Sequence, residues 1–508
     1  MDPVLSKYEA RLLDKLCESQ SIISSLELIN NAGKLSAQYF VENIDNPFNQ
    51  RVLVLAGKGN NGADAFVMHY YLLYYGINSR IFFLNKVKNK NITKHYKIED
   101  STIIDVLDSK EVSFYDWVVD GIFGIGLNRN IGTKYNDVIS LIKSKKIISI
   151  DIPSGLDCDT GLAKYGGNIC HPRYVLSMGY FKNANIINEG KEFFPVTKVL
   201  DIAFPKVGNL IKGLNTFIVN NDDIKKRILK DSLLRNKYDR LCTMIVGSKK
   251  YIGAGIISSK SAINIGAGYV NTVIPEKLHA IYSQVNYDAI NISVGNFNKG
   301  IFKESDFKII KDLDLFQKRG PLLIGPGLGD DLETAKFTAR TLKYISSMDC
   351  PCVLDASAFV SLYKKCIDIS DLPKNCVLTP HYGEFKKIFP DVNFSFENPI
   401  DDCKKIIHRL GGRVLILKGP TTIIIGKSKK IYIQNNSNSL LAVAGSGDVL
   451  SGIILGLISI GYSTEDASIL SVYIHNQCSI KHYSEISRKV MTVSNIIDLI
   501  PRVFDDLL

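Results

Sequence analysis

The sequence predicts an α/β protein of two domains, each built on a mainly parallel sheet. A chain of 508 residues is too long for one hydrophobic core, so at least two domains are expected. Short apolar runs alternate with helical patterns in both halves, which is the order of elements in α/β sandwiches. Several of these runs end in glycine-rich turns or acidic residues, and open α/β sheets bind ligands beyond the carboxyl ends of their strands.

The first half begins with two predicted helices, followed by a strand, a turn and a third helix. Residues 8–16 and 22–40 carry apolar side chains at the three-four spacing of helices, and we expect no strand before residue 51. Residues 51–56 form a short apolar run typical of a buried strand. The segment 57–64, GKGNNGAD, supplies a glycine turn, and the pattern over 65–75 predicts the helix after it.

The glycines of this turn formally match the GxGxxG pattern of dinucleotide-binding folds. An ordinary fold of that kind has an acidic residue about 20 residues later, at the end of the next strand, to bind the ribose. Here the next predicted strand, 80–85, ends in Asn85. The pattern therefore does not predict a dehydrogenase that transfers hydride.

Two more predicted strands end in turns of functional character. Residues 114–120 precede the turn GIFGIG, and residues 146–151 precede Ile-Pro-Ser-Gly. Because the carboxyl ends of parallel strands meet at one edge of a sheet, we expect a binding site there. The polar residues predicted to meet at this edge are Asn60, Asn61, Asp64, Asp120, Asp151 and Ser154. Each of them alone also suits a cap or a turn.

The second half repeats the alternation of strands and helices. Further strands within 165–205 close the first half, and the polar, glycine-free segment 220–240 leads us to place the domain boundary between residues 212 and 213. Predicted strands then begin at residues 241, 320, 352, 377 and 414. The small residues of 255–268 indicate a tightly packed helix, and 421–426 with 430–434 predict a β-hairpin.

The segment 444–452, AGSGDVLSG, opens a long apolar run and predicts a glycine-rich turn that leads into a helix. Free backbone N–H groups and the positive end of the helix dipole would hold an anion there, and glycines allow it to approach closely. Asp448 would repel that anion unless it acts as a general base toward a hydroxyl that attacks a bound phosphate. It equally suits a helix cap, and the segment alone leaves both interpretations open.

Four other polar residues of the second half have a functional and a structural interpretation. Lys418, at a strand end, would neutralise a phosphate, or is ordinary surface charge. His381 would donate to a substrate amide or phosphate, or is structural. Glu384 is best explained as a residue of a helix's first turn. Asp355 is either a hydrogen-bonded strand-end residue or a ligand of a metal-bound water. No cluster has zinc-site spacing, and no GxxxxGK[ST] P-loop is present.

The composition indicates a globular cytoplasmic protein. The net charge of +11 is spread along the chain, which favours attraction of an anionic substrate rather than nucleic-acid binding. Ten cysteines without a CxxC pair indicate reduced thiols. No signal peptide is visible, and the longest uncharged apolar run is too short and too rich in glycine and serine to span a membrane.

The longer motifs together resemble two enzyme families. GKGNNGAD, VDGIFGIGL and IDIPSGLDCDTG are similar to NAD(P)H-hydrate epimerases. GPGLG, LTPHYGEF, LKGPTTII and AGSGDVLSG are similar to ADP-dependent NAD(P)H-hydrate dehydratases, a branch of the ribokinase-like superfamily. The order of the motifs matches the bifunctional NAD(P)H-hydrate repair enzymes over nearly the whole chain. The resemblance implies a Rossmann-like three-layer sandwich at 1–212 and a ribokinase-like α/β sandwich at 213–508.

The resemblance also implies a reaction. NADH or NADPH hydrated at C6 of the nicotinamide ring, NADHX or NADPHX, is inactive. The first domain would interconvert the R and S epimers. The second would dehydrate the S epimer with ADP, which gives AMP, phosphate and the restored dinucleotide. We expect K⁺ in the first domain, Mg²⁺ in the second and a homo-oligomer, with no nucleic acid or membrane as partner. The preference for ADP over ATP stays open.

The resemblance assigns roles by motif position. Substrate contacts in the first domain fall on Asn60, Asn61, Gly62, Ala63, Asp64, Gly124, Ile125, Gly126, Leu127, Asn128, Arg129, Asn130 and Asp151, with Asp151 catalytic. The potassium ligands would be Asn61, Asp120 and Ser154. In the second domain the hydrate would contact Ala254, Gly327, His381 and Asp448, and the nucleotide Lys418, Gly419, Pro420, Thr421, Thr422 and Gly447. Asp448 would deprotonate the C6 hydroxyl, whose oxygen then accepts the phosphoryl group.

Three of the positions that depart from the usual motifs bear on the proposed sites, and two other functions stay open. Ala63 and Ala65 stand where glycine is usual, and their methyl groups would narrow the turn. Ser357 stands where aspartate is common, which weakens a metal-water role in that segment. One alternative is a small-molecule kinase of the ribokinase superfamily with Asp448 as base. The other is a non-catalytic dinucleotide-binding protein, although such a protein gains nothing from carboxylates beside phosphate.

Overall fold

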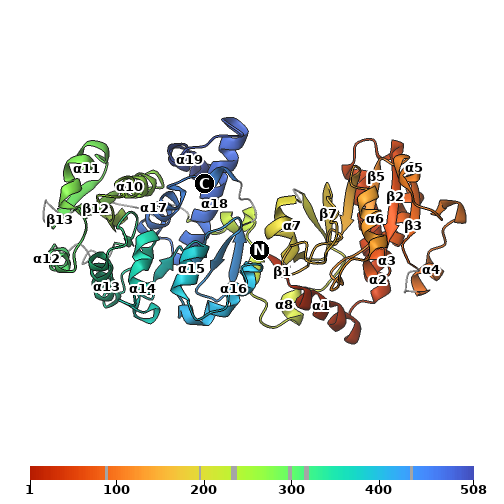
Figure 1. The fold of residues 1–508 in the computed structure, drawn as a ribbon, viewed down its shortest axis with the longest axis horizontal. Coiled ribbons are helices and arrows are strands. Elements are labelled where there is room, and N and C mark those ends of the chain that lie inside the picture. The colour runs from red at the N-terminus through yellow and green to blue at the C-terminus, as the bar shows by residue number, and fades with distance from the viewer. Residues whose placement is uncertain (86–89, 194–195, 230–236, 296–299, 314–319, 435–438) are drawn as a thin grey trace. The chain divides into compact units, whose positions relative to one another are not determined.

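The computed structural model describes residues 1–85, 90–193, 196–229, 237–295, 300–313, 320–434 and 439–508. They divide into two compact units, one over Asp2–Thr216 and the other over Phe217–Leu508 together with Met1. Each unit has its own helices and strands (Figure 1). The polar segment at the predicted boundary adjoins this division, and its residues 230–236 lie outside the described residues.

The N-terminal unit contains a seven-stranded parallel sheet in the order β4-β3-β2-β5-β6-β7-β9, which confirms the α/β class. Its strands, with the separate pair β1 and β8, are β1 Asp2–Leu5, β2 Arg51–Ala56, β3 Asn78–Phe83, β4 Ile103–Ile104, β5 Trp117–Gly121, β6 Lys146–Ile150, β7 Tyr174–Met178, β8 Phe181–Lys182 and β9 Thr197–Leu200. Its helices are α1 Lys7–Ser19, α2 Ser25–Asn43, α3 Asn60–Tyr74, α4 Lys90–His95, α5 Ser109–Ser113, α6 Thr133–Leu141, α7 Asn188–Phe193 and α8 Val207–Leu210. The strand order reverses between β2 and β5, and crevices at such a reversal are the usual ligand sites of open α/β sheets.

Alternate residues of the central strands build two cores, one on each face of this sheet. Val52 and Val54 of β2 pack in a core that includes Phe66 of α3. Leu53 of β2 instead packs in a core with Ile139 of α6. Side chains of a strand point alternately to opposite faces, so a sheet covered on both faces needs apolar residues at every position. This arrangement is the predicted three-layer sandwich.

Two details of the N-terminal unit differ from the sequence prediction. The expectation of no strand before residue 51 was wrong, because β1 forms and pairs in parallel with β8. Its four residues carry no decisive pattern, and their backbone partners lie far along the chain. Helix α3 begins at Asn60 rather than near residue 65. The first four N–H groups of a helix have no partner within it, so asparagine and glycine cost little at these positions.

The C-terminal unit is also built on a mainly parallel sheet. Strands β13-β12-β11-β14-β15-β16-β17 are parallel, and β18 and β19 continue the sheet as the predicted antiparallel hairpin. The strands are β10 Thr216–Ile218, at the junction of the units, β11 Leu241–Ile245, β12 Tyr269–Pro275, β13 Ile290–Val294, β14 Leu322–Ile324, β15 Cys352–Leu354, β16 Cys376–Leu378, β17 Val414–Leu417, β18 Thr422–Ile425 and β19 Ile431–Gln434. The helices are α9 Asn221–Lys225, α10 Gly253–Asn264, α11 His279–Val285, α12 Phe307–Asp312, α13 Leu332–Ser346, α14 Val360–Tyr363, α15 Tyr382–Ile388, α16 Pro399–Ile406, α17 Ser446–Ser459, α18 Thr464–Glu485 and α19 Val493–Asp505.

Helix α17 lies in the core of this unit, against α10 (Figure 1). Small residues allow the close contact, because a Cβ atom on Gly452 would lie 2.3 Å from the carbonyl oxygen of Ser258. This confirms the prediction of a tightly packed helix in the region 255–268. No helix within the described parts of the chain is both long enough and apolar enough to cross a membrane.

Candidate active sites

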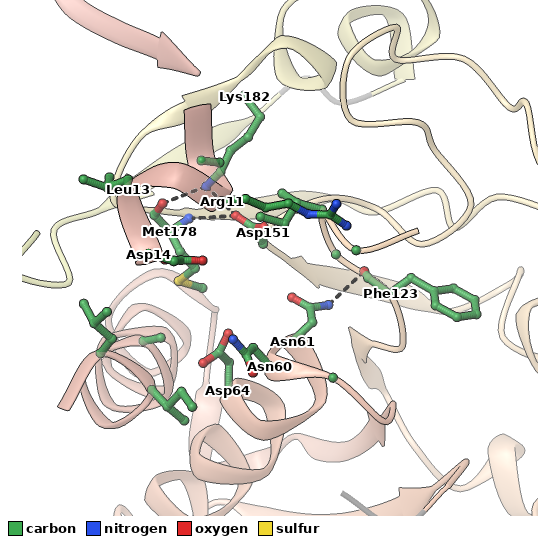
Figure 2. Close-up of a pocket in the computed structure, with 18 of the residues that line it drawn as sticks. Arg11, Leu13, Asp14, Asn60, Asn61, Asp64, Phe123, Asp151, Met178 and Lys182 are labelled. Atoms are coloured by element: carbon green, nitrogen blue, oxygen red, sulfur yellow. Dashed lines mark hydrogen bonds and ion pairs between the residues drawn. The ribbon is translucent and has the colours of Figure 1, made fainter. Parts of the chain in front are cut away.

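A cavity of about 630 Å³ opens in the N-terminal unit at the carboxyl ends of β2 and β5. Helices α1 and α3, the turn after β5 and the end of β6 contribute to its wall (Figure 2). The predicted residues that line it are Asn60, Asn61, Asp64, Gly124, Ile125, Gly126, Leu127, Asn128, Arg129 and Asp151. Gly62, Ala63 and Asn130 do not line it, and neither do Asp120 and Ser154. The cavity thus unites most of the predicted strand-end residues.

Asp151 pairs with a lysine that sequence reasoning missed. Lys182 Nζ lies 2.5 Å from Asp151 Oδ1, and both side chains are largely buried (Figure 2). The lysine also donates to the carbonyl oxygen of Met178 at 2.7 Å. Asp151 has a positive φ of 65°, in the left-handed region that Asp and Asn tolerate best among side-chain-bearing residues. This backbone conformation and the ion pair fix one carboxylate oxygen at the cavity wall.

Behind the cavity wall, Asp120 and Ser154 form a buried network with Asn61. Asp120 accepts from the Ser154 hydroxyl at 2.5 Å, from the Ser154 N–H at 2.9 Å and from the Ser149 hydroxyl at 2.7 Å. The side-chain amide of Asn61 donates to the carbonyl oxygen of Phe123 at 2.9 Å. Asn61 Oδ1 is buried and has no hydrogen-bond partner among the described residues. Buried polar atoms are normally paired, so this oxygen is free for a ligand.

Ala63 and Ala65 are accommodated by the core rather than crowding the cavity. Both are buried in the core between α3 and the sheet. A Cβ atom on Gly121 would lie 2.3 Å from the Ala65 methyl, so the missing side chain of that glycine makes room for it. The glycine turn is instead tight at Gly62, where a Cβ atom would lie 2.0 Å from the Gly57 carbonyl oxygen. The two alanines therefore leave the lining of the cavity unchanged.

In the C-terminal unit, the AGSGDVLSG segment forms the predicted turn and helix start. Gly445 has a φ of 89°, a left-handed conformation that suits glycine, and α17 begins at the next residue. Asp448 lies in the first turn of α17, and its side chain makes no capping hydrogen bond there. Burial raises the pKa of Asp448 to about 7, helped by Asp355 and opposed by Lys418. A carboxyl group with a pKa near neutrality suits a general base better than a cap.

Lys418 links this turn to the strand ends. Its ammonium lies 2.8 Å from Asp355 Oδ1, which also accepts from the Thr379 hydroxyl at 2.7 Å. A Cβ atom on Gly447 would lie 3.2 Å from Lys418 Nζ, so the lysine reaches the turn. Burial disfavours the charged lysine, but Asp355 outweighs it and the pKa of Lys418 is raised. Asp355 is thus a hydrogen-bonded strand-end residue, the first of its two predicted interpretations.

His381 caps helix α15 with its ring. Nδ1 accepts from the N–H groups of Gly383 at 3.0 Å and Glu384 at 3.3 Å, while the Glu384 carboxylate accepts from the His381 N–H at 2.9 Å. Partial burial and Lys418 lower the pKa of His381, which favours the neutral ring. With Nδ1 as acceptor, the proton of the neutral ring lies on Nε2, which can donate to a ligand. Glu384 lies in the first turn of α15, which confirms its predicted place.

The other predicted residues lie in turns and on one strand of this unit. Gly327 has a φ of 72°, and a Cβ atom on it would lie 3.1 Å from that of Ala254, so these two predicted substrate contacts are neighbours. Gly419, Pro420 and Thr421 connect β17 to β18, and Thr422 begins β18. Sequence reasoning assigned no role to His475, whose Nε2 lies 3.0 Å from the Ser446 hydroxyl under the turn. Burial lowers its pKa to about 4, so it supports the turn as a neutral ring.

Comparisons with known proteins find matches to both halves of the chain. The family model described as NAD(P)H-hydrate dehydratase matches residues 242–502, and the one described as YjeF-related protein N-terminus matches residues 25–184. A bifunctional NAD(P)H-hydrate repair enzyme of Dictyoglomus turgidum is 29% identical over 99% of this chain and 99% of its own. One of Thermofilum pendens is 27% identical over 97% of this chain and 94% of its own. A solved structure, the ADP/ATP-dependent NAD(P)H-hydrate dehydratase of Bacillus subtilis co-crystallised with ATP and Mg²⁺, is 23% identical, covers 57% of this chain and 98% of its own, and has a TM-score of 0.45.

Proposed function

The chain belongs to the NAD(P)H-hydrate dehydratase family, and we propose that it is a bifunctional repair enzyme for hydrated NADH and NADPH. The N-terminal cavity interconverts the R and S hydrates, and the C-terminal unit dehydrates the S hydrate with ADP. The observation that carries the proposal is the half-buried Asp448 in the first turn of α17, where free N–H groups suit an anion, in a chain whose N-terminal unit holds a separate cavity.

The dehydration follows from the residues around Asp448. Lys418 and the N–H groups at the start of α17 stabilise the charge of the transferred phosphoryl group. Asp448 takes the proton from the C6 hydroxyl, whose oxygen attacks the terminal phosphorus of ADP. AMP departs, and loss of the resulting phosphate with a proton restores the nicotinamide double bond. Mg²⁺ would accompany the nucleotide phosphates and neutralise their charge.

The direct test is incubation of a mixture of R and S hydrates with ADP. The absorbance of the reduced nicotinamide should recover fully, because epimerisation feeds the R hydrate into dehydration. AMP and inorganic phosphate should appear in equal amounts. A stable phosphorylated product would instead identify a kinase, and no turnover at all would leave only a dinucleotide-binding protein.

The dehydration rate should depend on the ionisation of Asp448. Because the carboxylate is the active form and its pKa is about 7, kcat/KM for the S hydrate should rise with pH up to about 7 and then level off. Below the pKa it should fall about tenfold for each pH unit. The measurement is dehydration of pure S hydrate from about pH 5 to about pH 9, under single-turnover conditions. A rate that does not change across this range would contradict the assignment.

We also propose that the network behind the N-terminal cavity holds K⁺. Asn61 Oδ1, the Phe123 carbonyl oxygen, Asp120 and Ser154 offer hard oxygen ligands with a single full charge. Divalent cations usually gather more carboxylates, and no group of three or more His, Cys, Asp or Glu side chains arranged for a metal is found in the described ranges. The ion would offset the charge of the substrate pyrophosphate and fix the turn after Asp120.

Epimerisation should therefore depend on the cation. Replacing K⁺ by a bulky organic cation at equal ionic strength should lower the rate about 10- to 100-fold, as loss of a structural ligand does at other metal sites. Asp120→Asn should be slow in every cation, because the only full charge of the network is lost. Rates would be compared in potassium, sodium and the organic cation. A wild-type rate and affinity that are equal in all three would remove the ion site from the proposal.

A further inference from the structure

Helix α1 places a carboxylate in the N-terminal cavity that no motif of the sequence indicated. The helix begins with a capping box between Ser6 and Glu9, and its apolar side packs through Leu13 and Cys17. Asp14, next to this apolar side, lines the cavity and lies near Asp151 and Lys182 in Figure 2. The sequence marked this segment only as an amphipathic helix.

The start of α1 is fixed to the loops that border the same cavity. The Lys7 N–H donates to Asp159 at 2.7 Å, and Lys7 Nζ donates to the carbonyl oxygen of Leu127 at 2.5 Å. Leu127 belongs to the turn that lines the cavity. These long-range bonds hold the helix, and with it Asp14, in a constant position relative to the site.

Among the described charged side chains of the cavity wall, Asp151 is paired with Lys182, whereas Asp14 is not paired. Lys182 Nζ donates hydrogen bonds to Asp151, Met178 and Ser177, all within 3.3 Å. Asp14 has no hydrogen-bond or ion-pair partner within the described part of the chain. Asp151, Asp14 and Asp64 of α3 are the carboxylates near Lys182, and the cavity lining also contains Arg11, Lys58 and Arg129. Carboxylates that lie close together disfavour each other's ionisation, which raises the pKa of those without a direct partner.

The surroundings of Asp14 favour the protonated form. Burial raises the pKa of Asp14 to about 6, Lys182 opposes this, and Asp151 and Glu18 add to it. The pKa of Asp64 is also raised well above its usual range, by burial and then by Asp151 and Asp14. Asp151, in contrast, has its ammonium partner at 2.5 Å. The wall therefore combines a paired carboxylate with two neighbours whose pKa values are raised.

We propose that Asp14 is a second proton-transfer residue of the epimerase cavity, acting as the acid toward the hydroxyl at C6 while Asp151, paired with Lys182, acts as the base. This inference rests on the proposed epimerase function and adds a residue to it. Inversion at a carbon that bears a hydroxyl and a ring nitrogen needs proton transfer to the departing oxygen and from the arriving one. Two carboxyl groups can act as this acid and this base when their surroundings give them different pKa values.

The step balances with water as the only co-reactant. Asp14 donates a proton to the C6 hydroxyl, the C–O bond breaks, and the lone pair of the ring nitrogen forms a C=N bond as water leaves. Water then attacks C6 from the opposite face, its proton passes to Asp151, and the electron pair of the C=N bond returns to nitrogen. Conversion in the reverse direction exchanges the two roles. One oxygen from solvent enters the product for each inversion.

The test compares Asp14→Asn, Asp14→Glu and the control Asp137→Asn in the full-length chain. The readout is conversion of pure R hydrate, with the epimers separated chromatographically and the reaction run in ¹⁸O-labelled water. Asp14→Asn should lower kcat about 100- to 10,000-fold and change KM little, because the lost group acts in the transition state. Asp14→Glu should recover part of the rate. Asp137→Asn makes the same chemical change at an exposed position of α6 outside the cavity lining, and it should stay within about threefold of wild type.

The pH profile distinguishes an acid from a merely structural residue at position 14. In wild type, kcat/KM should fall as pH rises through about 6, the pKa of Asp14, and Asp14→Asn should lose this fall. Trp117 is the only tryptophan and lies in β5, so its fluorescence reports whether the N-terminal unit of each variant is folded. If Asp14→Asn is unfolded, the test rests on Asp14→Glu, which keeps a carboxyl group. A folded Asp14→Glu variant with a rate below about one thousandth of wild type would contradict the role of Asp14 as the acid.

Wild-type behaviour separates this inference from the proposal on which it rests. Wild-type chain that leaves the R hydrate unchanged would overturn the epimerase function itself. Wild-type chain that epimerises, with Asp14→Asn equally fast and with the same pH profile, would overturn only the role of Asp14. Inversion without ¹⁸O in the product would likewise overturn it, because the C–O bond would then not have been broken.

Discussion

Asp448→Asn is expected to lower dehydration of the S hydrate by about 100- to 10,000-fold, the usual loss when a general base is removed. The substitution keeps the size of the side chain and the start of α17, so Lys418 and the free N–H groups still meet the phosphates. Nucleotide affinity should therefore change little. The measurement is single-turnover dehydration of the pure S hydrate, with ADP affinity from calorimetry on the same preparation.

The same substitution should not weaken the fold. The pKa of Asp448 rises from an ordinary value near 4 in the unfolded chain to about 7 in the folded one. Folding therefore takes up a proton between these values, and stability falls as pH rises through them and then stays constant. Asparagine carries no such penalty, so Asp448→Asn should be at least as stable as wild type at neutral pH.

Asp498→Asn serves as the matched control for this substitution. It makes the same chemical change at an exposed position of α19, for which no hydrogen bond or ion pair of the side chain is found in the described residues. We expect dehydration and stability close to wild type. Dehydration by Asp448→Asn at the wild-type rate would contradict the role of Asp448 as base.

The strand-end sites were predictable because periodicity and topology act together. Each of β2, β5 and β6 is a continuous apolar run, and continuous runs are typical of strands covered on both faces. The carboxyl ends of parallel strands meet at one edge of the sheet, so the order of elements alone predicts that Asn61 and Asp151 line one site, as they do. The turn before α17 was predictable in the same way, from glycines at the start of a long apolar helix.

The residues that sequence reasoning missed depend on contacts between distant segments. Lys182 lies on the short strand β8 and acquires its role only from Asp151, 31 residues earlier. Asp14 looks like any polar residue of an amphipathic helix until α1 is placed against the cavity. Strand β1 exists because β8 pairs with it. Local patterns do not encode such partners, and a lysine or an aspartate in isolation is most often a surface charge.

Lys182→Met should have the second large effect, on both stability and epimerisation. Removing one partner of a buried ion pair leaves the other charge without compensation and typically costs about 3–5 kcal/mol. The free energy of unfolding of the N-terminal unit should fall by this amount, measured by urea denaturation with Trp117 fluorescence. Epimerisation should fall at least about 100-fold, because Asp151 loses the ammonium group that fixes its carboxylate at the cavity wall. Lys198→Met, on the exposed side of β9, is the control and should change neither quantity.

The double variant Lys182→Met with Asp151→Asn separates the two effects. Asparagine tolerates the left-handed backbone at residue 151 as well as aspartate does, so this substitution adds no backbone strain. Replacing both charges of a buried pair by neutral groups is often close to neutral for stability. Most of the lost unfolding free energy should therefore return, while epimerisation stays at the level of the single variant, since no carboxylate is left at that position. Recovery of epimerisation together with stability would show that the pair serves the fold alone, and that the base of this cavity is another residue.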